Sequence, residues 1–167
     1  MTTRLILIRH AESGWDDPFA DDHARVLTND GRTAATAVGN WLAHSGYVPD
    51  VILCSDAART VETMDRVTAG FDRLPMIVLD KMLYHPSPDT ILEQARKRTE
   101  AAVAVVAHNP GIGMVADAVL TTRPNHRRFL DYPSGAVTVI DFDGKPDFSK
   151  GRLVDFVVPS DLNAYLP

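Results

Sequence analysis

The sequence contains a single cysteine, Cys54, so no disulfide can form within the chain. Its first apolar run, residues 5–8, is too short for the hydrophobic region of a secretion signal or for a membrane span. Basic residues form no block, and a net charge of −5 is spread along the chain, unlike the surface of a duplex-binding protein. These absences predict a cytoplasmic protein that binds neither membranes nor nucleic acid.

Internal repeats, low-complexity segments and linkers are also absent, which favours a single domain over residues 1–167. A hydrophobic content of 45% and a charged content of 23% are ordinary for a globular domain, and a chain of 167 residues can bury a full core. The negative net charge would repel a polyanionic ligand unless positive charge is concentrated locally. An anion site must therefore be a small, focused pocket.

Short apolar runs rich in branched residues predict strands that are buried on both faces of a sheet. These runs cover residues 4–8, 51–53, 76–79 and 102–107. Capping residues before the segments and glycines after them predict helices between the strands. The predicted helices cover residues 28–44, 57–69 and 87–98.

This alternation predicts an α/β fold, a three-layer αβα sandwich with a mostly parallel sheet. The segments 136–142 and 152–158 alternate more strictly between apolar and polar residues, and a turn-rich stretch connects them. We expect them to form a C-terminal hairpin at the edge of the sheet. In such folds ligands bind just beyond the carboxyl ends of the parallel strands.

Charged side chains follow three of the predicted strands. Arg9 and His10 come directly after the first strand, Arg59 lies in the first turn of the helix after the second, and His108 follows residues 102–107. Guanidinium groups match phosphoryl oxygens, and helix N-termini add N–H donors. An imidazole can attack phosphorus, and water can cleave the phosphorus–nitrogen bond afterwards. The sequence therefore predicts a pocket for a phosphoryl group.

Six segments in this order resemble the histidine phosphatase superfamily, and most closely its small SixA-like branch of phosphohistidine phosphatases. They read LILIRHAESGWDDP, RVLTNDGR, LCSDAARTVET, LYHPSP, VVAHNPGI and YPSGAV. The resemblance spans residues 4 to about 140 and implies a phosphoglycerate mutase-like fold. It further implies a metal-independent phosphatase without a cofactor, whose substrate is a phosphohistidine protein or a small phosphorylated molecule.

The resemblance also implies roles for individual residues. His10 matches the nucleophile that accepts the phosphoryl group, Arg9 and Arg59 match the arginines that bind it, and His108 matches a second histidine that donates to its oxygens. Three further residues are expected to contact the substrate: Arg25, Ser55 and Asn109. The backbone around residues 134–135 is expected to close one side of the pocket.

Two departures from the family pattern stand out. Ala11 replaces the glycine that usually follows the histidine, a change that the small branch tolerates. The segment 79–85 has no clearly placed glutamate to protonate a leaving oxygen, so the general acid is missing unless Tyr84 or His85 supplies it. A missing acid suits a phosphohistidine substrate, because imidazole is a better leaving group than an alkoxide. The absence of a long insertion that could cap the site favours a protein substrate.

Other interpretations of the same residues remain open. The chain could hydrolyse small phosphoesters, or it could be a non-catalytic phosphate-binding module that needs the arginines but no nucleophile. A divalent-metal site is disfavoured, because arginines would repel the ion. The acidic stretch with Asp16, Asp17, Asp21 and Asp22 is predicted to be a solvated loop, and Cys54 to be a buried apolar residue without a catalytic role.

Overall fold

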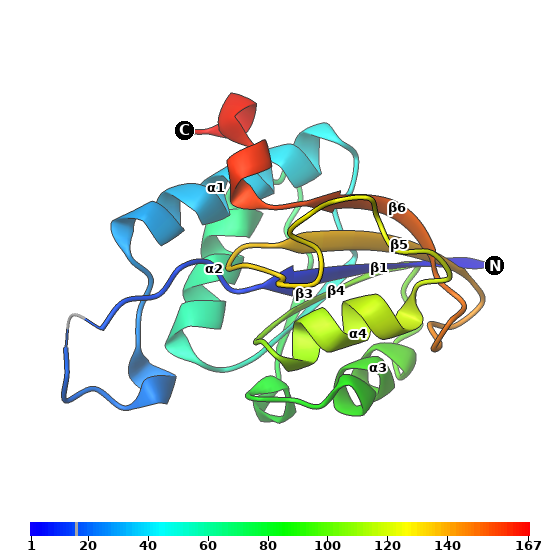
Figure 1. The fold of residues 1–167 in the computed structure, drawn as a ribbon, viewed down its shortest axis with the longest axis horizontal. Helices are drawn as coiled ribbons and strands as arrows, with labels where there is room; N and C mark the ends of the chain where they lie inside the picture. The colour runs from blue at the N-terminus through cyan, green and yellow to red at the C-terminus, as the bar shows by residue number, and fades with distance from the viewer. Residues whose placement is uncertain (16) are drawn as a thin grey trace.

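Six strands form one sheet in residues 1–15 and 17–167, which the computed structural model describes (Figure 1). The strands are β1 (Thr2–Arg9), β2 (Val51–Cys54), β3 (Met76–Leu79), β4 (Ala102–Ala107), β5 (Val137–Asp143) and β6 (Arg152–Val157). The α-helices are α1 (Asn29–His44), α2 (Ala58–Thr68), α3 (Pro88–Arg96) and α4 (Gly111–Val119). Short 3-10 turns follow β1 and β3, namely η1 (Asp22–Ala24) and η2 (Lys81–Leu83).

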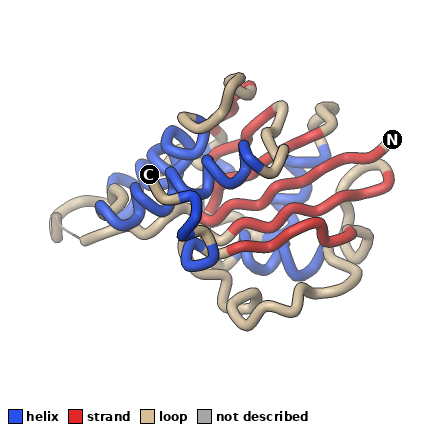
Figure 2. The backbone as a smooth tube through the Cα atoms, turned by 90° about the horizontal axis from the view of Figure 1, so that it is seen from above, coloured by secondary structure: helices blue, strands red, loops and turns tan. Residues whose placement is uncertain are grey.

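The sheet is mostly parallel, as predicted. Its strand order is β3-β2-β4-β1-β5-β6, and the neighbours from β3 to β1 pair in parallel. Strand β5 runs antiparallel to β1, and β6 runs antiparallel to β5, so the predicted C-terminal hairpin forms one edge of the sheet (Figure 2). The strands that carry the predicted site residues, β1, β4 and β2, are therefore adjacent.

Helices cover both faces of the sheet, which gives the predicted three layers. In β1, Leu5 and Leu7 pack with α3 and α4, whereas Ile6 and Ile8 pack with α1 and α2. Figure 1 shows these two pairs of helices on opposite sides of the sheet. Because successive side chains of a strand point to opposite faces, a strand that is buried on both faces needs a continuous apolar run.

The predicted N-terminal caps of α1 and α3 are confirmed by their hydrogen bonds. The hydroxyl of Thr28 accepts the backbone N–H of Gly31 before α1, and the hydroxyl of Ser87 accepts that of Thr90 before α3. Pro88 occupies the first turn of α3, where it costs no hydrogen bond. Helix α3 ends at Arg96, two positions before the predicted boundary.

One strand prediction is wrong. The run 76–79 does form β3, but this strand lies at the sheet edge and is not buried on both faces. Met76 and Leu79 are 56% and 54% exposed. The apolar run resembles that of a central strand, and only the strand order shows that no further strand covers it.

Helices α1 and α2 approach each other closely at Gly39. A Cβ atom at this position would lie 2.2 Å from the backbone oxygen of Val67, far inside contact distance. Because backbone atoms at this crossing cannot move aside without shifting a helix, the position requires glycine. The crossing fixes the α2 helix, whose first turn carries Arg59.

We predict that Gly39→Ala lowers the free energy of unfolding by about 1–3 kcal/mol, the usual cost of overpacking, although alanine is the better helix former. Urea unfolding followed by circular dichroism measures this change. Thr33→Ala on the exposed side of α1 is the matched control and should stay within about 0.5 kcal/mol of the parent. Equal stability of the Gly39 variant and the parent would show that the helices separate easily.

Candidate active site

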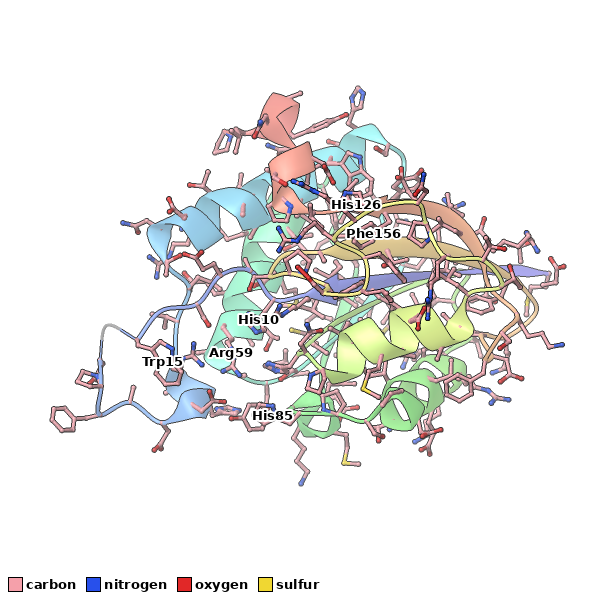
Figure 3. All side chains as sticks on the ribbon, viewed as in Figure 1. His10, Trp15, Arg59, His85, His126 and Phe156 are labelled. Atoms are coloured by element: carbon pink, nitrogen blue, oxygen red, sulfur yellow. The ribbon has the colours of Figure 1, made fainter. Side chains whose placement is uncertain are left out.

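A polar cavity of about 330 Å³ lies beyond the carboxyl ends of β1, β2 and β4. It contains the two arginines and two histidines that the sequence placed at these strand ends, together with Arg25 and Asn109. The full lining is Arg9, His10, Glu12, Ser13, Asp22, Arg25, Arg59, His85, His108, Asn109 and Ser134. Figure 3 shows His10, Arg59 and His85 together at this end of the sheet, whereas His126 and Phe156 lie apart from them.

His10 is held in one tautomer. The residue is only 7% exposed, and Nδ1 of its ring lies 2.7 Å from the backbone oxygen of Ala11. A carbonyl oxygen can only accept, so Nδ1 carries the hydrogen and Nε2 keeps its lone pair. Burial, aided by the charges of Arg59 and Arg9, lowers the pKa of His10 to about 4, against the opposing hydrogen bond to Ala11. At neutral pH this imidazole is uncharged and can act as a nucleophile at Nε2.

His108 is the second buried imidazole. It is 1% exposed, and its ring centroid lies 5.3 Å from that of His10. Its Nε2 lies 2.8 Å from the hydroxyl oxygen of Ser55, which also accepts the N–H of Ala57. Burial, followed by the proximity of His10 and Arg59, lowers the pKa of His108 to about 3. Ser55 therefore lies behind His108 and orients it; it is absent from the residues that line the cavity.

Arg9 brings a guanidinium group to the cavity. Its Nη1 donates to the backbone oxygen of Tyr132 at 2.9 Å, and the side-chain amide of Asn109 donates to the same oxygen at 3.0 Å. Its Nε is buried without a hydrogen-bond partner in the part of the chain that the structure describes, and so is Nδ1 of His108. The ion pairs found within residues 1–15 and 17–167 do not include Arg9. Its charge is therefore not neutralised by a carboxylate there.

Arg59, by contrast, points both arms of its guanidinium at Asp22. It is 3% exposed; Nη1 donates to the backbone oxygen of Asp22 at 2.7 Å and Nη2 to Oδ2 at 3.0 Å. Arg25 donates from Nη1 to Oδ1 of the same carboxylate at 3.0 Å. The hydroxyl of Tyr84 also donates to Oδ2, and Nε2 of His85 lies 3.3 Å from it. Asp22 thus connects three separate segments of the chain, its own, the start of α2 and the segment after η2.

The prediction that Asp22 belongs to a solvated acidic loop is wrong, and Asp16 of the same prediction lies outside the described residues. Hydrogen bonds from Tyr84, then from Arg25 and Arg59, hold the pKa of the Asp22 carboxyl well below its ordinary range, although burial acts in the opposite direction. Asp22 is therefore ionised and cannot serve as a proton donor. The spacing of Asp22 and Arg25 by three residues was the sequence signal for their contact.

Arg25 is anchored at the rim of the cavity. Its Nε donates to the backbone oxygen of Gly14 at 3.2 Å, and Nη2 donates to the Ser13 hydroxyl at 2.9 Å. Its guanidinium carbon lies 3.5 Å from the centroid of the Trp15 ring. These contacts hold the loop after β1 against the site and support the expectation that Arg25 reaches the pocket.

The structure adds one candidate for the general acid and characterises another. Burial and the Asp22 carboxylate raise the pKa of the Tyr84 hydroxyl. It therefore stays protonated and donates a hydrogen bond to Asp22. Besides Asp22, Glu12 is the carboxylate that lines the cavity, and it is exposed and accepts the Thr28 hydroxyl at 2.8 Å. Glu12 was not predicted as a site residue, because the glutamate of the family pattern was expected only after the third strand.

Cys54 packs in the core as predicted, since it is fully buried and burial raises the pKa of its thiol to about 12. In the described ranges, His, Cys, Asp and Glu side chains form no group of three or more that could hold a metal ion. None of the helices there combines the length and the apolar character that a membrane crossing requires.

Comparisons relate this chain to known proteins. The profile of the histidine phosphatase superfamily (branch 1) matches residues 5–83. An uncharacterized chloroplastic protein of Arabidopsis thaliana is 44% identical over 72 residues, which are 43% of this chain and 33% of that protein. The chain thus spans about a third of that plant protein. An uncharacterized protein of Mycobacterium leprae is 28% identical over 164 residues, or 91% of this chain and 99% of that protein.

A solved structure extends the similarity to the whole fold. A candidate phosphohistidine phosphatase, SixA, from Agrobacterium tumefaciens is 28% identical, with a TM-score of 0.79. The superposition covers 94% of this chain and 98% of that protein. The order of strands and helices described above is therefore that of a SixA-like, phosphoglycerate mutase-like fold.

The buried imidazole of His10 leads to a prediction for NMR. We expect its ring signals to titrate near pH 4, about two units below an exposed histidine, because burial disfavours the imidazolium. A ¹H–¹³C titration between pH 3.5 and 8 measures the midpoint, and the His10→Asn spectrum identifies the signal. A midpoint near 6.5 would mean that His10 is solvated and that the site is more open than described.

Proposed function

Because this chain belongs to the histidine phosphatase superfamily, we propose that it hydrolyses a phosphoryl group through a phosphohistidine formed on His10. The observation that carries this proposal is the state of the His10 ring. Its Nδ1 hydrogen is donated to the Ala11 oxygen, and its uncharged Nε2 belongs to a cavity lined by three arginines. A mere phosphate-binding module would need these arginines but no unprotonated imidazole among them.

In the first step, Nε2 of His10 attacks phosphorus and the bond between phosphorus and the leaving group breaks. Arg9 and Arg59 bind the phosphoryl oxygens, where negative charge is concentrated, and His108 lies beside them as a further polar contact. The His10 ring becomes an imidazolium with phosphorus on Nε2 and hydrogen on Nδ1, and the carbonyl of Ala11 accepts that hydrogen. No proton has to leave the nucleophile.

In the second step, water attacks the phosphorus of phospho-His10, and the electron pair of the phosphorus–nitrogen bond returns to Nε2. His10 leaves as the neutral ring that began the cycle, and inorganic phosphate is released. The chemistry needs positioning and positive charge rather than a Lewis acid, so the proposed phosphatase is metal-independent and uses no cofactor.

We propose a phosphohistidine of a protein as the substrate. The likeness to a candidate phosphohistidine phosphatase at 28% identity supports this choice. So does the chemistry of the cavity, where Asp22 is ionised and has no proton to give, while the raised pKa of Tyr84 makes it a weak acid whose hydrogen is already donated to Asp22. Small phosphate esters are the second candidate, and the carboxyl group of Glu12 at the rim is the observation that favours them.

We predict that His10→Ala abolishes turnover and labelling of the enzyme by a ³²P-phosphohistidine peptide, because the nucleophile is lost. The fold should persist, since His10 lies at a strand end and not in the apolar core. Circular dichroism, acid-quenched labelling and phosphate release, all in EDTA, measure these properties. Residual turnover above about a hundredth of the parent rate would exclude phospho-His10, and loss of all parent activity in EDTA would exclude a metal-independent reaction.

We predict that Arg59→Lys lowers kcat/KM by about 10²–10³-fold, because lysine keeps the charge but loses the fork that contacts two oxygens at once. Steady-state kinetics with the phosphohistidine peptide measure the loss. Arg66→Lys, on the same helix near its C-terminus, is the matched control and should retain the parent value. If Arg59→Lys matched this control, charge alone would suffice and Arg59 would not bind the phosphoryl group by its geometry.

A further inference from the structure

The proposed function leaves open the role of Asp22, which lines the cavity. Its carboxylate binds Arg25 and Arg59, accepts the Tyr84 hydroxyl and lies beside His85. A loop that only needed closing would not require an ionised carboxylate between two arginines of a phosphate site. A carboxylate here weakens the attraction of both arginines for phosphate, so binding of phosphate alone does not account for it.

One contact in the cavity shows what the carboxylate can bind. Nε2 of His85 lies 3.3 Å from Oδ2 of Asp22, while the His85 side chain remains 55% exposed. The His85 ring centroid is 5.5 Å from that of His108. His85 thus shows that an imidazole nitrogen can reach Asp22 beside the second buried histidine, and a substrate ring would take the place of this exposed side chain.

The leaving group of a phosphohistidine is also an imidazole, and one of its ring nitrogens must keep a hydrogen during the reaction. When the phosphorus–nitrogen bond breaks, its electron pair moves to the ring nitrogen that carried phosphorus. If the other ring nitrogen holds a hydrogen, a neutral imidazole departs; if it does not, the product is an imidazolate, a very poor leaving group. The reaction therefore depends on keeping a proton on the nitrogen remote from phosphorus.

We propose that Asp22 binds this N–H of the substrate imidazole and so determines specificity for phosphohistidine over phosphate esters. The proposal rests on the proposed function, because it assumes transfer to His10. In the reaction, the phosphorus–nitrogen bond of the substrate breaks as the bond to Nε2 of His10 forms, and the N–H bond facing Asp22 stays intact. The carboxylate keeps the substrate in its protonated, reactive form, and it offers no proton to an alkoxide.

Charged and titratable groups from every side meet Asp22. Arg25 follows η1 on its own segment, Arg59 comes from α2, and Tyr84 and His85 follow η2. His108 at the end of β4 completes the set and is electrostatically coupled to Asp22. The arginines and the tyrosine hydroxyl already act as donors toward Asp22, so the carboxylate is the charged acceptor that this cluster offers to an imidazole N–H.

The test compares two leaving groups in Asp22→Asn, which preserves size and removes the charge. We expect kcat/KM for a phosphohistidine peptide to fall about 10- to 100-fold, the range for losing one charge-assisted hydrogen bond. For p-nitrophenyl phosphate, whose leaving group needs no proton, we expect kcat/KM to hold or to rise, because the two arginines lose the carboxylate that competes with phosphate. Asp21→Asn is the matched control: it removes the same charge from an exposed neighbour and should leave both substrates unaffected.

A pH profile separates this role from a structural one. In the parent, phosphohistidine turnover should extend to higher pH than in Asp22→Asn, because the carboxylate raises the pKa of the bound substrate ring. The p-nitrophenyl phosphate profiles of the two proteins should coincide on the alkaline side. An equal loss for both substrates, or unchanged phosphohistidine turnover, would overturn the role of Asp22. Failure of the proposed function looks different, since the parent itself would then form no labelled His10.

Discussion

The hydrogen-bond ladder between β1, β4 and β2 is the constraint on which the site depends. Parallel pairing aligns Arg9 with Ala107 and Cys54 with Val106, and the ladder continues one residue beyond the strands. The N–H of His10 donates to the Ala107 oxygen, and the N–H of Ser55 donates to the Val106 oxygen. His10, His108 and Ser55 are thereby held at one level. A slip of one residue in the pairing of β1 with β4 would turn His10 into the opposite layer, and the same slip between β2 and β4 would turn Ser55 away from His108.

Burial of His10 and His108 at the end of these strands determines the charge state of both rings. Two imidazoles 5.3 Å apart, both largely removed from solvent and both close to Arg59, are far more stable uncharged than protonated. Their neutrality leaves Arg9, Arg25 and Arg59 as the cations of the cavity, and Asp22 as the carboxylate that balances two of them. An incoming phosphoryl group therefore encounters Arg9, which no ion pair engages within residues 1–15 and 17–167, and competes with Asp22 for Arg59. This arrangement attracts a phosphate dianion toward Arg9 and leaves the space beside Asp22 for the leaving group of the substrate.

The sequence was sufficient to predict the site residues that follow the paired strands, but not those that lie in loops. Arg9, His10 and His108 directly follow continuous apolar strands, so their meeting at one sheet edge could be predicted from periodicity alone. Asp22 lies in a polar segment without periodicity, and its approach to Arg59 depends on where the η1 turn lies against the start of α2. The same limit explains β3, because an apolar run does not show whether a neighbouring strand will cover it.

The two halves of the proposed reaction have the same chemistry, which accounts for a site without a clear general acid. In each half, phosphorus leaves a ring nitrogen while the other nitrogen of that ring holds its hydrogen. For His10 the acceptor of that hydrogen is the neutral carbonyl of Ala11; for the substrate it is the ionised carboxylate of Asp22. The stronger acceptor faces the ring that arrives from solvent and must be kept protonated. The weaker one suffices for His10, because the fold itself fixes that tautomer.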